Sequence, residues 1–211
     1  LGPKMVEIPQ SWDIEKVGEV SEVVTGSTPD TDNEEFYGGD IAWVTPTDIT
    51  STEGAYLHDT ERKLTQEGLD SCSATLMEPG AVLVTTRATI GATAINTVSA
   101  ATNQGFKSLV PGDRLHAEYL YYYINSIRGY LEALGGGSTF PEVNKRDMTN
   151  LRVPVPPIEE QREIADIILK ADEKTAREKD RLDDLHELKR ALMQDLLTGQ
   201  VRLNRDLTNS Y

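Results

Sequence analysis

A stretch without glycine or proline, residues 158–197, most constrains how this chain can fold. Pro156 and Pro157 stand immediately before it, and proline fits the first turn of a helix but not its interior. Glu159 and Glu160 then place negative charge at the positive end of the helix dipole. We therefore predict one continuous helix, which at about 1.5 Å per residue would be roughly 60 Å long.

The predicted helix carries a seam of apolar residues in alternating steps of four and three. Such a seam is typical of coiled coils. A single helix cannot bury this stripe against itself, so we expect a partner helix to cover it; a helix that packs along its own domain is the open alternative. Thr175 and Glu178 interrupt the seam, and such breaks can set register. The apolar seam positions, which are the predicted dimerisation residues, are Ile164, Ile168, Ala171, Leu182, Leu185, Leu192 and Leu196.

The remaining composition argues against several classes of protein. No run of apolar residues approaches the roughly 18 needed to indicate a membrane span. Cys72 is the only cysteine, which excludes an internal disulfide and a paired-cysteine zinc site and fits a cytoplasmic protein. The sequence has neither a phosphate-binding loop nor a dinucleotide-binding glycine motif, and its histidines are isolated. We therefore expect a non-catalytic chain with no metal and no cofactor.

The charge of the chain is unevenly distributed. The net charge is −14, and residues 1–78 hold 17 acidic and 4 basic residues. Residues 79–157 reverse this balance, with 5 acidic and 7 basic residues, whereas residues 158–211 hold 13 acidic and 10 basic residues. One locally basic segment therefore lies inside an acidic chain, and it is the segment where a nucleic-acid contact would be expected.

The residues before the long helix predict an α+β domain. Short β-branched runs such as residues 81–86 indicate buried strands, and apolar residues at spacings of three and four indicate a helix over residues 117–134. Residues 144–150 are expected to form a short helix and residues 45–49 a polar loop. The predicted organisation is one globular domain with a mixed sheet and short helices (1–157), a long coiled-coil helix (158–198) and a C-terminal tail (199–211).

Eight short signatures occur along the chain in a definite order. They are IPQSW (residues 8–12), VGEV (17–20), TGSTP (25–29), GDIAWVTP (39–46), TTRATIG (85–91), TNQGFK (102–107), GSTF (137–140) and PVPPIEEQ (154–161). No single signature is diagnostic, but the ordered set, with the ending LMQDLLTG (192–199), closely resembles the DNA-specificity (S) subunit of type I restriction-modification systems over residues 8–203.

The resemblance implies a DNA-recognition role. The usual member of this family has two target-recognition domains and two conserved helices, whereas this chain has one of each, as a half-length subunit would. The family implies that the domain reads one half of a bipartite site in double-stranded DNA. It also implies that the helix sets the spacer, pairs antiparallel with its counterpart and docks methyltransferase (M) subunits and, where present, restriction (R) subunits. A homodimer without a membrane partner is therefore expected, and catalysis is assigned to the partner subunits.

Two other interpretations remain open at this point. The acidity of residues 1–78 is compatible with an interaction protein that mimics DNA and inhibits a DNA-binding enzyme. A recognition module of a fused methyltransferase-endonuclease would carry the same signatures.

Candidate DNA contacts lie mainly in the basic segment and in polar loops. Arginine and lysine suit phosphate oxygens, arginine can also pair with guanine, and side-chain amides can pair with adenine. For each residue the alternative is a purely structural role in a turn or at a helix cap. The predicted DNA-binding residues are Thr28, Thr45, Thr47, Arg87, Asn103, Gln104, Lys107, Ser138, Thr139, Lys145 and Arg146.

Overall fold

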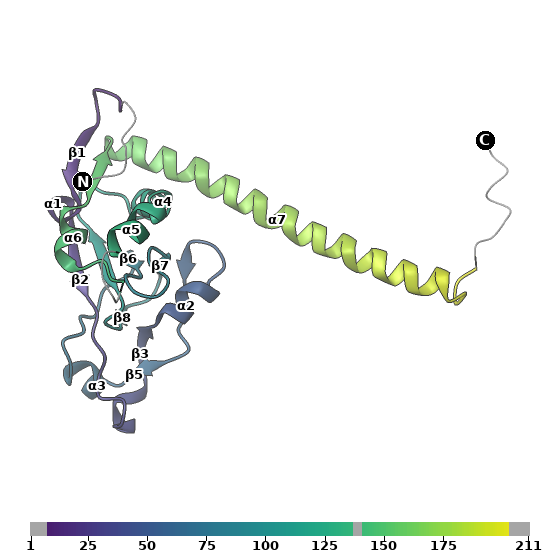
Figure 1. Ribbon diagram of the computed structural model, residues 1–211, viewed down its shortest axis with the longest axis horizontal. Coiled ribbons are helices and arrows are strands. Elements are labelled where there is room, and N and C mark those ends of the chain that lie inside the picture. Colours follow the sequence, from purple (N-terminus) through teal and green to yellow (C-terminus); the bar gives the residue numbers. More distant parts are fainter. Residues whose placement is uncertain (1–7, 137–140, 203–211) are drawn as a thin grey trace. The chain divides into compact units, whose positions relative to one another are not determined.

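The computed structural model describes residues 8–136 and 141–202. The chain divides into two compact units, residues 1–166 and residues 167–211. The first unit is an α+β domain with mixed sheets, and the second consists of the greater part of one long helix (Figure 1). The predicted fold class is therefore confirmed.

A five-stranded sheet forms the centre of the globular unit. Its strands, in spatial order, are β2 (Ser21–Thr25), β9 (Lys107–Pro111), β6 (Val82–Val84), β7 (Thr93–Asn96) and β4 (Tyr56–Leu57). β4 runs parallel to β7, and the other neighbours are antiparallel. The continuous apolar run predicted to be a buried strand is β6, whose three residues are all buried.

A second, three-stranded sheet lies at one end of the globular unit (Figure 1). Its strands, in spatial order, are β5 (Lys63–Leu64), β3 (Tyr37–Val44) and β8 (Ala100–Thr102). β3 pairs antiparallel with β5 and parallel with β8. The short helices η1 (Glu34–Phe36) and α3 (Gln66–Asp70) are next to this sheet in the chain.

The ends of the globular unit in the sequence meet in a two-stranded sheet. β1 (Asp13–Lys16) pairs antiparallel with β10 (Arg152–Val155). The short helix α1 (Val17–Val20) follows β1, and its Val17 and Val20 are both buried in the core. This pairing places β10, the strand before the long helix, beside β1, the first strand of the chain.

The helix predicted over residues 117–134 is interrupted. The structure contains α4 (Ala117–Ser126) and α5 (Arg128–Gly135), with Ile127 between them at φ −104° and ψ 14°. The side chain of Ser126 donates to the Tyr123 carbonyl, and such competition for backbone carbonyls favours bending or ending a helix. Ile127 remains buried, so the break keeps the apolar face against the core. The predicted short helix is present as α6 (Lys145–Asn150).

Two large apolar clusters and a smaller one around Trp43 hold the domain together. The larger cluster joins the five-stranded sheet to the helices and includes Leu109, Leu120, Ile124 and Met148. The second cluster lies around Phe106 and contains residues of both larger sheets. Packed side chains of these clusters therefore hold the strands next to the loop after β6 and the turn before β9.

The long helix α7 spans Ile158–Leu197, as predicted. Its first turns belong to the globular unit, where Gln161 is fully buried and Ala165 is 3% exposed. Ile164 packs against the larger core cluster. This residue therefore already has apolar neighbours within its own chain, and its role in dimerisation stays a prediction. Among the described residues, no helix is long and apolar enough to span a membrane.

Candidate nucleic-acid interface

Three loops of the globular unit converge beside the basic residues of the middle segment. The backbone N–H of Thr86 donates to the Gly105 carbonyl at 2.7 Å, and its side-chain hydroxyl donates to the same oxygen at 3.1 Å. The N–H of Val143 donates to the Thr86 carbonyl at 3.1 Å. These bonds fix the loop after β6, the turn before β9 and the segment before α6 relative to one another.

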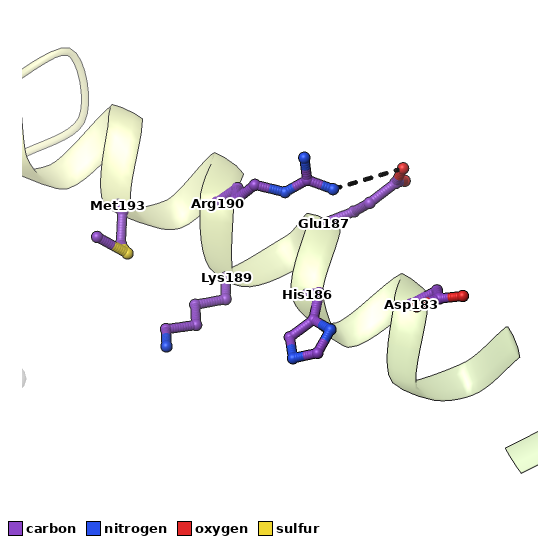
Figure 2. A pocket seen from close by; sticks show the side chains of 6 residues that line it. All are labelled: Asp183, His186, Glu187, Lys189, Arg190 and Met193. Atoms are coloured by element: carbon purple, nitrogen blue, oxygen red, sulfur yellow. Dashed lines mark ion pairs between the residues drawn. The ribbon is translucent and has the colours of Figure 1, made fainter. Parts of the chain in front are cut away.

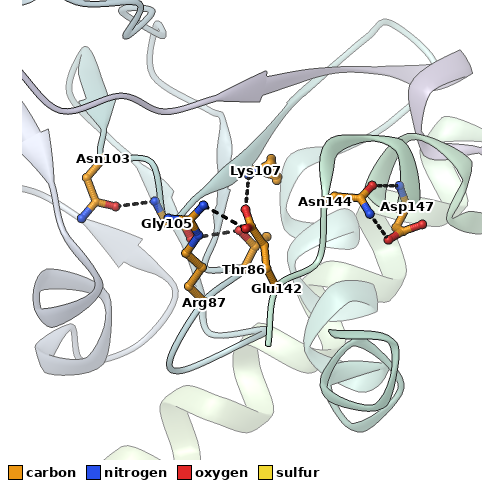
Figure 3. Close-up of polar contacts among 8 residues, drawn as sticks. All are labelled: Thr86, Arg87, Asn103, Gly105, Lys107, Glu142, Asn144 and Asp147. Atoms are coloured by element: carbon orange, nitrogen blue, oxygen red, sulfur yellow. Dashed lines mark hydrogen bonds and ion pairs between the residues drawn. The ribbon is translucent and has the colours of Figure 1, made fainter. Parts of the chain in front are cut away.

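Glu142 lies between two of the predicted DNA-binding cations (Figure 3). Its Oε2 accepts a hydrogen bond from Arg87 Nη2 at 2.8 Å, and its Oε1 accepts one from Lys107 Nζ at 3.3 Å. The Arg87 hydrogen bond is the main cause that lowers the pKa of the Glu142 carboxyl below its ordinary value, with a further contribution from Lys107. The carboxylate therefore stays ionised and neutralises part of the positive charge of this cluster.

The two cations differ in accessibility. The Arg87 side chain is 47% exposed, whereas the Lys107 side chain is only 5% exposed. Lys107 lies beside the turn before β9 as the first residue of that strand, and its side chain is buried. Arg87 can thus present guanidinium N–H groups to a ligand, and an oxyanion such as a phosphate oxygen could replace the Glu142 carboxylate as its partner. The role of both residues in DNA binding stays a prediction.

The turn before β9 holds two predicted base-contacting residues. The Asn103 Oδ1 accepts the Gly105 N–H at 2.9 Å, so this oxygen shapes the turn. The Thr28 hydroxyl donates to the Gln104 Oε1, which joins this turn to the loop after β2. A Cβ at Gly26 would lie 1.9 Å from the Asn103 carbonyl oxygen, so the two loops approach too closely for any other residue there.

The polar loop expected over residues 45–49 is instead the start of helix α2 (Pro46–Ser51). Thr45 caps this helix: its N–H and hydroxyl both donate to Asp48 Oδ2, at 2.7 and 2.6 Å. Thr47 lies in the first turn, where its carbonyl accepts a hydrogen bond from Ser51. The loop prediction was wrong because Pro46 at the first position and the Thr-x-x-Asp capping box favour a helix. The Thr45 hydroxyl therefore already has a structural partner.

Lys145 and Arg146 occupy the first turn of α6, after the capping residue Asn144. Both are exposed, and neither side chain forms an ion pair with another residue in the described parts of the chain. Cations are unfavourable near the positive end of a helix, so their position is not explained by the stability of α6. The remaining predicted DNA-binding residues, Ser138 and Thr139, lie outside the described residues.

The second unit exposes much of the predicted seam. Exposure is 52% for Leu182, 53% for Leu185, 48% for Leu192 and 40% for Leu196. Ile168 is partly exposed, and Ala171 is exposed. Within this unit, these seam side chains are therefore not covered by other parts of the helix.

Charged side chains also lie along the same stretch of α7 (Figure 2). Arg190 Nη2 lies 4.0 Å from Glu187 Oε1, and His186 and Lys189 are on neighbouring turns. These side chains come from one helix, so they line a shallow surface rather than an enclosed ligand site. Across residues 8–136 and 141–202, no group of three or more metal-ligating side chains is placed to hold an ion.

Glu142 and Arg62 are the two residues of interest that the sequence did not single out. Glu142 is an acidic residue within the locally basic segment, and this exception to the local charge was its only signal. Arg62 lies close to two aromatic rings, and no local pattern indicates that contact because the rings belong to β3, earlier in the chain.

Comparisons with known proteins agree with this architecture. A family model described as the type I restriction modification DNA specificity domain matches residues 9–187. The type I restriction enzyme MjaIX specificity subunit of Methanocaldococcus jannaschii is 40% identical over 164 residues, which cover 77% of this chain and 38% of that protein. The type I restriction enzyme HindI specificity subunit of Haemophilus influenzae is 25% identical over 201 residues, covering 92% of this chain and 42% of that protein.

Solved structures show the same fold. A chain from a study of complex assembly and conformational transition of the type I R-M system has a TM-score of 0.70 and 26% identity, and the match covers 91% of this chain and 47% of that one. The HsdS subunit from Thermoanaerobacter tengcongensis gives a TM-score of 0.66 at 24% identity, with 91% and 46% covered. The chain thus spans less than half the length of these relatives. Because the family model covers the globular unit and most of α7, the chain belongs to the family of type I restriction-modification DNA-specificity subunits.

Proposed function

We propose that this chain reads one half of a bipartite DNA site as a non-catalytic subunit of a type I restriction-modification complex. The observation that carries the proposal is the match of the DNA-specificity domain to residues 9–187. In this proposal the globular domain contacts the duplex, and α7 pairs with a second copy and docks the methyltransferase subunits. Methyl transfer to adenine, and DNA cleavage where restriction subunits are present, belong to those partners in the cytoplasm.

The apolar residues exposed on α7 support a paired arrangement. The described residues contain one globular unit and one long helix, and the matches cover 38% of the MjaIX subunit and 42% of the HindI subunit. The exposed seam on α7 provides the surface for pairing. Two copies related by a twofold axis would present two identical domains, so the target would be palindromic and split. We propose residues 1–157 as the recognition domain, 158–198 as the spacer helix and 199–211 as a tail.

The loop cluster around Glu142 supports the proposed DNA contacts. Arg87 is half-exposed and holds its guanidinium at the surface of three mutually bonded loops. Lys145 and Arg146 add exposed cations on α6, suited to phosphate oxygens. The amide of Gln104 and the hydroxyl of Thr28 lie together in the neighbouring loops, where amide and hydroxyl groups are suited to base edges.

The DNA-mimic alternative rests on the acidity of residues 1–78. It is not favoured, because the chain belongs to a family whose domain is described by DNA specificity. The two interpretations differ in one measurement. A mimic would bind the methyltransferase subunit and exclude duplex DNA from it, whereas the proposed subunit would bring duplex DNA into the complex.

Reconstitution tests the proposal directly. The chain would be combined with its cognate methyltransferase subunit and S-adenosylmethionine, and methylated adenines would be mapped across genomic DNA. We expect a palindromic motif in two halves separated by a fixed spacer. Adenine methylation that does not depend on this chain, or no sequence-specific methylation, would refute the proposed function.

A further inference from the structure

Arg62 holds its side chain against two aromatic rings at the end of the globular unit that contains β3 and β5. Its guanidinium carbon lies 4.5 Å from the centroid of the Tyr37 ring and 5.0 Å from that of the Trp43 ring. Both distances are within the range of cation–π attraction, which holds a guanidinium over a ring face. Arg62 immediately precedes β5, and both rings belong to β3, so the contact connects the two paired strands.

The aromatic rings are themselves fixed. Trp43 is 2% exposed, and its Nε1 donates to the Ser27 carbonyl at 3.2 Å. The Tyr37 hydroxyl donates to the Pro29 carbonyl at 3.1 Å. The two rings meet edge to face, with centroids 5.9 Å apart. The loop that contains Thr28 is therefore bonded to both rings.

The backbone of Arg62 is also held in place. Its carbonyl accepts the Trp43 N–H at 3.2 Å and the Thr60 hydroxyl at 2.7 Å. With both the main chain and the guanidinium restrained, the side chain has lost much of the rotamer freedom of an exposed arginine. A further ligand would thus bind it at a smaller entropic cost.

The guanidinium of Arg62 forms no ion pair with any residue in the described ranges. This is unexpected, because residues 1–78 contain 17 acidic residues. The adjacent Lys63 shows the usual outcome, with its Nζ 3.1 Å from Asp59 Oδ1. Arg62 is exposed, so its N–H groups keep their capacity to donate to an external acceptor.

We propose that Arg62 recognises a guanine in the half-site by donating hydrogen bonds to the major-groove edge of that base. This inference rests on the proposed DNA-recognition function and adds a specificity-determining residue to it. Arginine can donate two N–H groups to guanine O6 and N7 in the major groove, and this pairing needs a guanidinium held in one orientation. Contact with phosphate does not need that orientation, since a mobile lysine can satisfy it. The rings beneath Arg62 donate hydrogen bonds to the Ser27–Pro29 loop, and Thr28 of that loop donates to Gln104.

The test compares Arg62→Lys, Arg62→Ala and the control Lys63→Ala in the full chain reconstituted with the methyltransferase subunit. Arg62→Lys keeps the charge and loses the two-pronged donor geometry, and Lys63→Ala removes one positive charge at the adjacent position. Affinity would be measured for the motif that the wild-type complex methylates, for the motif with each G·C pair replaced, and for an unrelated duplex. Thermal unfolding would confirm that each variant is folded.

We expect both Arg62 variants to lose about 5- to 150-fold in affinity for the wild-type motif. Both should stop discriminating at one G·C position and should bind the unrelated duplex as the wild type does. The control Lys63→Ala should keep the wild-type preference for that G·C pair. If Arg62→Ala unfolds, Arg62→Lys alone decides. Retained discrimination in Arg62→Lys, or an equal loss on all duplexes, would overturn the proposal. A wild-type complex without sequence-specific methylation would instead refute the proposed function itself, and this inference with it.

Discussion

Gln161 gives the sharpest test of how the start of α7 is held in the globular unit. Its side chain is fully buried in the first turns of the helix. Its Oε1 accepts the His116 N–H at 2.8 Å, and its Nε2 donates to the Arg114 carbonyl at 2.9 Å and to the Pro156 carbonyl at 2.8 Å. One side chain therefore satisfies three backbone groups in two segments of the chain.

Replacing Gln161 with leucine keeps a similar volume and removes all three hydrogen bonds. The His116 N–H and the Arg114 carbonyl, which are partly buried, and the buried Pro156 carbonyl would lose this partner, at about 1–3 kcal/mol each when fully buried. Allowing for the apolar transfer of leucine, we expect a loss of about 3–5 kcal/mol in the free energy of unfolding. For a protein of this size the midpoint of thermal unfolding would fall by roughly 6–20 °C.

The assay is thermal and urea unfolding of the full chain, monitored by circular dichroism. Gln66→Leu is the matched control, because Gln66 donates to Asp70 at 2.9 Å on the exposed face of α3 and such a pair contributes at most about 0.5 kcal/mol. If Gln161→Leu destabilises the protein no more than Gln66→Leu does, the hydrogen bonds of Gln161 do not hold the start of α7.

The Gln161→Glu variant adds a signature that depends on pH. A carboxylate would face the Arg114 and Pro156 carbonyls, so burial and repulsion would raise its pKa above the ordinary value. A raised pKa in the folded state means that the variant is most stable at low pH, where the group is protonated, and loses stability as pH rises through that pKa. A difference from the wild type that does not change with pH would contradict this placement of the side chain.

Three further substitutions test the remaining surfaces. Leu192→Glu should weaken self-association at least tenfold in sedimentation equilibrium by placing a charge in an apolar seam, whereas Gln194→Glu, which adds the same charge to the opposite face, should not; equal effects would exclude this seam. Glu142→Gln should increase affinity for duplex DNA and steepen its salt dependence, and should cost about 1–3 kcal/mol in urea unfolding because buried Lys107 loses its charged partner. Since the pKa of Glu142 is lowered in the folded state, that cost should be constant above the ordinary carboxyl pKa of about 4.3 and should shrink as pH falls below it. Gly26→Ala should destabilise the domain by more than about 1 kcal/mol in the same assay, because its Cβ would overlap a backbone carbonyl; wild-type stability would contradict the observed loop contact.

Elements with strong local signals were predicted from the sequence. Helix α7 follows from its proline start and its uninterrupted composition, and β6 from its continuous apolar run. Helix α2 was missed although its signals were local, because Pro46 and the Thr45–Asp48 capping box were interpreted as turn residues. The break at Ile127 has a weaker signal, since it depends on side chains competing for backbone carbonyls.

The candidate site was harder to predict than the fold. Arg87 and Lys107 were identified by charge, but their common partner Glu142 is 55 and 35 positions away, respectively. Contacts at such separations come from tertiary packing, which local patterns do not encode. The aromatic neighbours of Arg62 also come from another strand. The sequence therefore identified residues capable of binding DNA without showing which of them already have partners in the protein.

The pairing of these cations has a consequence for specificity under the proposed function. Non-specific DNA affinity comes almost entirely from cations that neutralise phosphates, and this chain has a net charge of −14. Arg87 and Lys107 share the Glu142 carboxylate, and Arg114 pairs with Asp13 and Glu15. A duplex that offers only phosphates must displace these carboxylates, so its binding gains little free energy. A duplex that also offers matching base edges forms additional hydrogen bonds, which the carboxylates do not replace. Acidity and internal ion pairs thus lower the affinity for unrelated DNA more than that for the target, and the ratio of the two affinities is the quantity that a sequence-reading subunit needs.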